Sequence, residues 1–271
     1  MIESDEPGMA AGSVPAKWGV WGSGSNTWVG GDQLNNDYFG RIQNGLIGGD
    51  VTIDGVYIVG LSVGAEKDWT RIKYSGVGIE GDGAMISPYA AYIIDQYFYV
   101  DASAGMTWMR YHESSDSQSG DYNGKRWFAG ANLNASRTFD AWSASTNIGY
   151  LYTAERQDAY LTTSNYAQPE SKSRTGQIRS TTKLGRTHLT DWGWFYPYAS
   201  ARLEYDANKT GALYVDTQGT KAANSRFGTT FGVGSSVGLG SNSSLTLEGT
   251  STEFREHSSI YGISGTVRVT F

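Results

Sequence analysis

The 271-residue sequence has no cysteine, few prolines and no long hydrophobic run. Without cysteine, a disulfide framework, a thiolate metal site and thiol redox chemistry are all excluded. No stretch approaches the roughly 18 consecutive apolar residues that a membrane helix needs. Against 5 prolines stand 36 glycines and an aromatic content of 13%, a balance that favours strands and turns over helical bundles. We therefore expect an all-β protein.

The sequence also has fewer basic residues than acidic ones, 21 against 27. The net charge is −6 and the isoelectric point is about 5.1, which argues against a nucleic-acid-binding protein. The mean hydropathy of −0.41 is typical of soluble proteins. A membrane β-barrel has a similar mean hydropathy, because its lumen-facing residues are polar. Residues 1–7 are acidic and lack the pattern of a secretion signal, so we expect any such signal to lie outside this chain.

From Trp18 to Phe271 the sequence divides into segments in which apolar residues fall on alternate positions, as in antiparallel strands. In the last segment Tyr261, Ile263 and Val267 share one face, and polar residues occupy the other. Long polar connectors are expected at 30–39, 70–81, 112–124, 155–173 and 207–223, with short turns between them. The twelve predicted strands are 17–29, 40–53, 56–69, 82–94, 97–111, 125–138, 141–154, 174–187, 192–206, 224–239, 244–254 and 259–271.

Short and long connectors alternate along this series, and the number of strands is even. Both features are typical of outer-membrane barrels, which have short periplasmic turns and longer extracellular loops. Aromatic residues near the strand ends, such as Trp28, Trp108 and Trp142, suit the girdles at the membrane interfaces. A β-sandwich with an aromatic core is the alternative, but it has no reason to sort its loops. We predict a twelve-stranded antiparallel transmembrane β-barrel at 17–271, preceded by a tail at 1–16.

Five segments strengthen this prediction by their order and spacing: Trp18 to Gly22, Gly48 to Ile53, Ser87 to Tyr92, Tyr196 to Ala199, and Val267 to Phe271. With them the chain resembles the C-terminal translocator β-domain of autotransporters, the type V secretion proteins of Gram-negative bacteria. The resemblance implies a monomeric barrel in the outer membrane that exports an N-terminal passenger to the cell surface, with the linker threading the lumen. Its implied partners are outer-membrane lipid, its own passenger and linker, and the barrel-assembly machinery.

The family usually places a helix inside the barrel before the first strand. Here the tail at 1–16 contains two prolines and two glycines, which make a long regular helix unfavourable. At up to roughly 3.3 Å per residue, a tail of this length can still cross a belt about 25 Å tall. We expect the tail to cross or plug the lumen, and we expect no cofactor.

Two sets of site residues follow. When the apolar face of each strand is taken as lipid-facing, eight charged residues point inward and are predicted to line a hydrated pore, or alternatively to pair with one another: Glu66, Asp101, Arg179, Lys183, Arg202, Glu204, Glu248 and Arg268. The resemblance further implies that the terminal strand carries a barrel-assembly signal, formed by Tyr261, Val267, Val269 and Phe271.

The alternatives to a translocator are an outer-membrane barrel enzyme, of phospholipase or protease type, and a passive porin or adhesin. A hydrolase could draw on His112 with Ser114 and Asp116, although such neighbours are common in polar loops. His112-Glu113 and Glu256-His257 offer metal ligands, but the HExxH spacing is absent. We therefore expect neither a catalytic centre nor a metal site.

Overall fold

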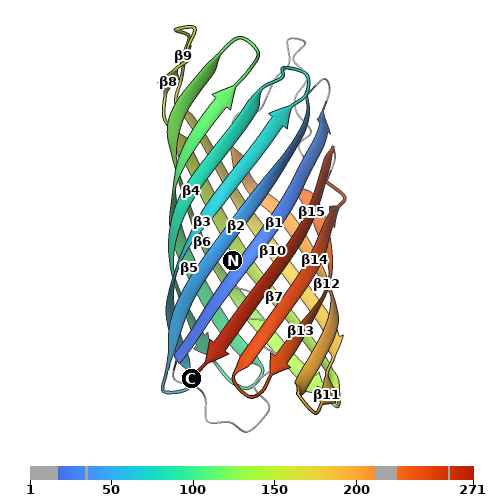
Figure 1. Ribbon diagram of the computed structural model, residues 1–271. Helices are drawn as coiled ribbons and strands as arrows, with labels where there is room; N and C mark the ends of the chain where they lie inside the picture. Colours follow the sequence, from blue (N-terminus) through green and yellow to red (C-terminus); the bar gives the residue numbers. More distant parts are fainter. Residues whose placement is uncertain (1–17, 34–35, 211–224, 256) are drawn as a thin grey trace.

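The computed structural model describes residues 18–33, 36–210, 225–255 and 257–271 and forms a closed antiparallel β-barrel (Figure 1). The tail expected at 1–16 lies outside these residues. Within the part of the chain that is described, no helix has the length and apolar character that crossing a membrane requires. The strands are β1 (Trp18–Gln33), β2 (Asn36–Ile53), β3 (Tyr57–Ile72), β4 (Gly78–Ile93), β5 (Phe98–Ser114), β6 (Ser119–Phe139), β7 (Trp142–Gln157), β8 (Tyr160–Leu161), β9 (Ala167–Gln168), β10 (Ser171–Arg186), β11 (His188–Thr190), β12 (Gly193–Thr210), β13 (Phe227–Leu239), β14 (Ser243–Glu253) and β15 (Ser258–Thr270).

Twelve of these strands form the wall, and each pairs with its neighbours in the chain. The ring closes where β1 pairs with β15, from Gly19 opposite Thr270 to Gly31 opposite Ser258. Of the three short strands, β8 and β9 form a separate hairpin, whereas β11 belongs to the barrel sheet and continues the pairing of β10 with β12. The predicted twelve-stranded barrel is therefore confirmed.

The two ends of the barrel differ in their connections. One end has the tight turns 54–56, 94–97, 140–141 and 240–242, together with the chain's C-terminus (Figure 1). Asp54, Gly55 and Asp140 adopt positive φ angles of 54°, 72° and 55° in these turns, a conformation that Asp, Asn and Gly tolerate best. The other end has the longer connections, including residues 158–170, which contain the β8–β9 hairpin.

The strands run further than predicted at this second end. The predicted connectors at 30–39, 70–81 and 112–124 are mostly strand, since β1 reaches Gln33, β3 reaches Ile72 and β5 reaches Ser114. Above the lipid belt both faces of a strand meet water, so the alternation of apolar and polar residues stops while backbone pairing continues. The pattern therefore marks the edge of the belt rather than the end of the strand.

The outer face of the barrel is apolar and the inner face is polar. Ile47, Ile148 and Val233 point outward with 65%, 55% and 68% of their surface exposed. Many of the buried residues are polar or charged instead, including Asp50, Lys183, Asp206 and Ser236. This reverses the usual distribution in soluble proteins and matches a barrel that meets lipid outside and encloses a polar lumen.

Candidate functional site in the barrel interior

One polar cluster of the interior is built around Arg126 on β6. Its Nε donates to Glu155 Oε2 on β7 at 2.8 Å, and its Nη2 donates to Asp68 Oδ2 on β3 at 3.4 Å. Its Nη1 also bonds Glu66 on β3. Because β3 and β6 are separated in the wall by β4 and β5, these side chains meet only across the concave side of the sheet. One cation thus contacts three carboxylates inside the barrel.

Tyrosines pack around this cluster and connect it to the end with the longer loops. Tyr111 Oη donates to Glu155 Oε1 at 2.6 Å, and the rings of Tyr111, Tyr122 and Tyr160 stack with centroids 5.0 and 4.5 Å apart. In the β8–β9 hairpin, burial and the neighbouring Glu113 carboxylate raise the pKa of Tyr160. Its hydroxyl therefore stays protonated and donates to Glu113 Oε2 at 2.9 Å.

A second cluster lies near the tight-turn end and crosses the closure of the barrel. Arg268 on β15 makes a bidentate pair with Asp50 on β2, with N–O distances of 2.9 and 2.6 Å. Tyr89 on β4 donates to Asp50 Oδ2 at 2.8 Å and accepts from Trp21 Nε1 on β1 at 2.6 Å. This network joins the first and last strands by side chains as well as by backbone.

A third cluster is held by Arg255, which lies in the connection between β14 and β15. Its Nη1 bonds Asp206 Oδ2 and its Nη2 bonds Glu204 Oε2 on β12, both at 3.1 Å. Gln177 on β10 donates to Asp206 Oδ1 at 2.7 Å. Burial by itself would lower the pKa of Arg255, but the hydrogen bonds and charges of the two carboxylates outweigh it and raise the pKa. Arg255 is thus a permanent cation.

The other interior charges of β5, β10, β12 and β14 have local polar contacts. Asp101 accepts from Asn132 and Asn134 at 2.8 and 2.5 Å. Glu248 accepts from Ser200 Oγ at 2.8 Å, and Lys183 Nζ lies 4.1 Å from the centre of the Tyr198 ring. Arg202 donates to Thr181 Oγ1 at 3.3 Å, and Arg179 donates to Gln177.

All eight charged residues singled out in the sequence thus face the interior, but they do not form one site. Glu66 joins the Arg126 cluster, Arg268 joins the Asp50 cluster, and Glu204 joins the Arg255 cluster. The sequence reasoning missed several of their partners. Asp50 and Asp68 share the inward alternation of their strands and could have been found that way, whereas Glu155 fell in a predicted loop and Arg126 stood at the edge of a predicted strand.

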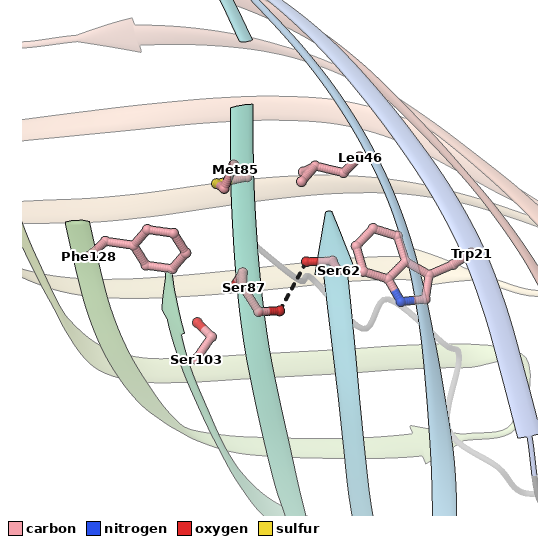
Figure 2. Close-up of a pocket in the computed structure, with 7 residues that line it drawn as sticks. All are labelled: Trp21, Leu46, Ser62, Met85, Ser87, Ser103 and Phe128. Carbon is pink, nitrogen blue, oxygen red and sulfur yellow. Dashed lines mark hydrogen bonds between the residues drawn. The ribbon is translucent and has the colours of Figure 1, made fainter. Parts of the chain in front are cut away.

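Between the Arg126 and Asp50 clusters the inner wall is less polar. A cavity of only about 10 Å³ lies here, about the space of one water molecule. Figure 2 shows its surroundings, in which Ser62 Oγ donates to the carbonyl oxygen of Ser87 at 3.2 Å. The lining residues are Trp21, Leu46, Ser62, Met85, Ser87, Ser103 and Phe128.

The residues considered for hydrolysis and metal binding lie elsewhere. His112 is exposed on the outer face of β5, and its Nδ1 lies 2.7 Å from Asp121 Oδ1 rather than beside Asp116. Glu256 lies outside the described residues. Among those that are described, no group of three or more His, Cys, Asp or Glu side chains could hold a metal ion.

The residues expected to carry the assembly signal lie on or just after β15, at the closure of the barrel. Tyr261, Val267 and Phe271 point outward with 54%, 50% and 67% of their surface exposed, and Val269 alternates onto the same face. The amide of Phe271 donates to the carbonyl oxygen of Trp18 at 2.9 Å. The last residue therefore continues the pairing of β15 with β1.

The comparison with known families decides what this barrel is. The family model of the autotransporter β-domain matches residues 20–250. The chain belongs to the autotransporter β-domain family. It is accordingly an outer-membrane translocator barrel that mediates export of an N-terminal passenger, in the bacterial outer membrane. None of the curated protein sequences matches it.

Solved autotransporter structures share the fold at low sequence identity. The translocator domain of NalP from Neisseria meningitidis matches with a TM-score of 0.77 at 13% identity, covering 97% of this chain and 90% of that one. The β-domain of the Bordetella autotransporter BrkA matches with a TM-score of 0.76 at 15% identity, covering 94% and 100%. The transport unit of AIDA-I from Escherichia coli gives 0.60 at 14% identity, covering 93% and 89%.

Proposed function

We propose that the inward charged residues of this autotransporter β-domain line a hydrated lumen and hold the passenger's linker during export. A linker that crosses the membrane inside a barrel needs polar partners for its backbone groups, because lipid supplies none. The wall offers carboxylates, guanidinium groups and hydroxyls along its height. The observation that carries the proposal is the Arg126 cluster, in which strands three places apart expose charged groups to one shared interior.

The charges of the wall are unevenly distributed, which suits a linker with groups of both signs. Carboxylates predominate on β3 to β7, where Glu66, Asp68, Asp101 and Glu155 point inward and Arg126 pairs with all of them except Asp101. Inward cations are found mainly on β10 and β12, at Arg179, Lys183 and Arg202, beside the carboxylates Glu204 and Asp206 of β12. A peptide between these two stretches lies in a transverse field that orients its dipoles and charged side chains.

In this proposal the interior charges act by binding and the chain is not an enzyme. The carboxylates of the Arg126 and Arg255 clusters are engaged by arginine, and none has the nucleophile or base partner that hydrolysis requires. The passive porin or adhesin is the remaining alternative, and it predicts no movement of an attached segment.

The outward face of β15 has a separate proposed role in assembly. Tyr261, Val267, Val269 and Phe271 give the barrel-assembly machinery an apolar strand ending in an aromatic residue. The finished barrel then works as a monomer in outer-membrane lipid, with its own passenger and linker as partners.

A reporter fusion tests the export function. An unstructured epitope is joined ahead of Met1 in the full chain, and the fusion is expressed with a secretion signal in a Gram-negative host. We expect external protease to remove the epitope from intact cells while the barrel remains in the outer membrane. A folded barrel whose epitope stays in the periplasm would contradict the proposal and favour a passive porin.

A further inference from the structure

Cations are aligned on the outer face of the barrel, at the end with the longer loops. Lys125 on β6 lies directly opposite Arg156 on β7, and Arg156 lies directly opposite Lys172 on β10. We call these three residues the basic row. All three are exposed and alternate with the inward-facing residues of their strands. Like charges at opposed positions of a sheet destabilise it, so the row needs an anion beside it.

One carboxylate of the chain pairs with part of this row. Glu170, just before β10, pairs with Arg156 and lies 2.5 Å from Lys172 Nζ. The hydrogen bond from Lys172, together with the charge of Arg156, lowers the pKa of Glu170, so this carboxylate is ionised. Within the described part of the chain, neither Lys125 nor the adjacent Arg174 on β10 has an ion pair. Of the three cations of the row and Arg174, only Arg156 and Lys172 are therefore paired with a carboxylate among the described residues.

The row stands at the height of lipid headgroups. One step toward the tight-turn end, the next outward residues are Trp127, Ala154 and Arg174, which are paired across the same three strands. The indole of Trp127 packs against the ring of Tyr152 with centroids 5.0 Å apart. Such aromatic pairs sit at the membrane–water interface of outer-membrane barrels. The basic row lies just beyond this interface, on the extracellular side.

We infer that Lys125, Arg156, Lys172 and Arg174 form a binding site for the phosphate groups of a phosphorylated lipid in the outer leaflet. Neighbouring strands lie about 4.8 Å apart, so the row presents cations at a spacing that lets one phosphate contact two of them. Lysine and arginine form strong charge-assisted hydrogen bonds with phosphate oxygens. The acyl chains of the same lipid would lie along the apolar wall below Trp127. The inference rests on the orientation of the barrel in the outer membrane and not on passenger export.

The same strands provide a matched control at their other end. Arg137 on β6 and Arg186 on β10 are exposed cations near the tight turns, and Arg186 lies 6.0 Å from the centre of the Trp142 ring. K125Q/R174Q and R137Q/R186Q each remove two positive charges from the outer face of β6 and β10. Only K125Q/R174Q changes residues of the proposed site.

The test is native mass spectrometry of the folded full chain in non-ionic detergent, titrated with bisphosphorylated lipid A, with the same lipid after phosphate removal, and with inorganic phosphate. Because each cation at a membrane surface contributes about a fivefold gain in affinity, we expect K125Q/R174Q to weaken lipid A binding about thirtyfold. We expect R137Q/R186Q to leave it unchanged, and inorganic phosphate not to compete.

Equal binding of lipid A with and without its phosphates by the unmodified chain would overturn the inference, and so would equal losses of affinity in the two double variants. Full competition by inorganic phosphate would also overturn it, because the site would then bind anions without recognising lipid. The comparison of the two lipids uses only the unmodified chain, so it holds even where K125Q/R174Q folds poorly.

Discussion

Arg126 is the most informative residue to change, because it is the one cation of the described residues that pairs with Glu66, Asp68 and Glu155. Its side chain is 24% exposed, and those of the three carboxylates are 14 to 17% exposed, so water compensates only part of the loss. Removing one partner of such a buried ion pair costs about 3 to 5 kcal/mol. Glutamine keeps a donor for Glu155, and the lumen is hydrated. We therefore expect Arg126→Gln to lower the free energy of unfolding by about 3 kcal/mol.

The assay is urea-induced unfolding of the barrel in lipid vesicles, followed by tryptophan fluorescence. With a denaturant dependence of about 2 kcal/mol per molar urea, the midpoint should fall by about 1.5 M. Arg110→Gln, on the exposed outer face of β5, is the control and should change stability by less than about 0.5 kcal/mol. Adding Glu66→Gln to Arg126→Gln should restore part of the stability, since one uncompensated carboxylate is removed. A loss no larger than that of Arg110→Gln would refute this account of the cluster.

Three further outcomes are expected. The purified chain should require detergent and shift its gel mobility on heating, because residues such as Ile47 and Val233 expose an apolar outer face; a monodisperse monomer without detergent would contradict this. Deleting Phe271 should lower the yield of heat-modifiable barrel in the outer membrane without changing export to the periplasm, and an unchanged yield would count against the assembly signal. Deleting residues 1–16 should raise single-channel conductance in planar bilayers, and unchanged conductance would place the tail's role outside the lumen.

Much of the fold is encoded locally and could be predicted from the sequence. The alternation in segments such as Tyr261 to Phe271 defines which side chains meet lipid, and the tight turns at Asp54-Gly55 and Asp140 separate the strands. The upper ends were harder to predict. In residues 119–124 of β6 the outward Ser119, Asp121 and Asn123 are polar, and two of the three inward residues are glycines. Tyr122 alone does not make an alternation that distinguishes this strand from a loop. What holds it is pairing with β5.

The partners inside the lumen could not be predicted in the same way. Alternation gives the direction of Glu66 and Arg268, but not the residues that they meet. Arg268 pairs with Asp50, 218 positions away, and Arg126 contacts Glu66, 60 positions away. Both contacts depend on the number of strands and on their stagger around the closed barrel. The number of strands can be predicted from a single sequence, but their stagger cannot.

The central claim is that successive residues of one strand face a hydrated lumen and the lipid in turn. Because the chain has no cysteine, Ser103→Cys and Ala104→Cys on β5 each introduce a single thiol into the belt, the first beside the interior cavity of Figure 2 and the second on the exposed outer face. With the full chain in lipid vesicles, a charged water-soluble thiol reagent should label Cys at position 103 and spare position 104. Protection of both positions, or labelling of position 104 alone, would contradict a water-filled translocator lumen.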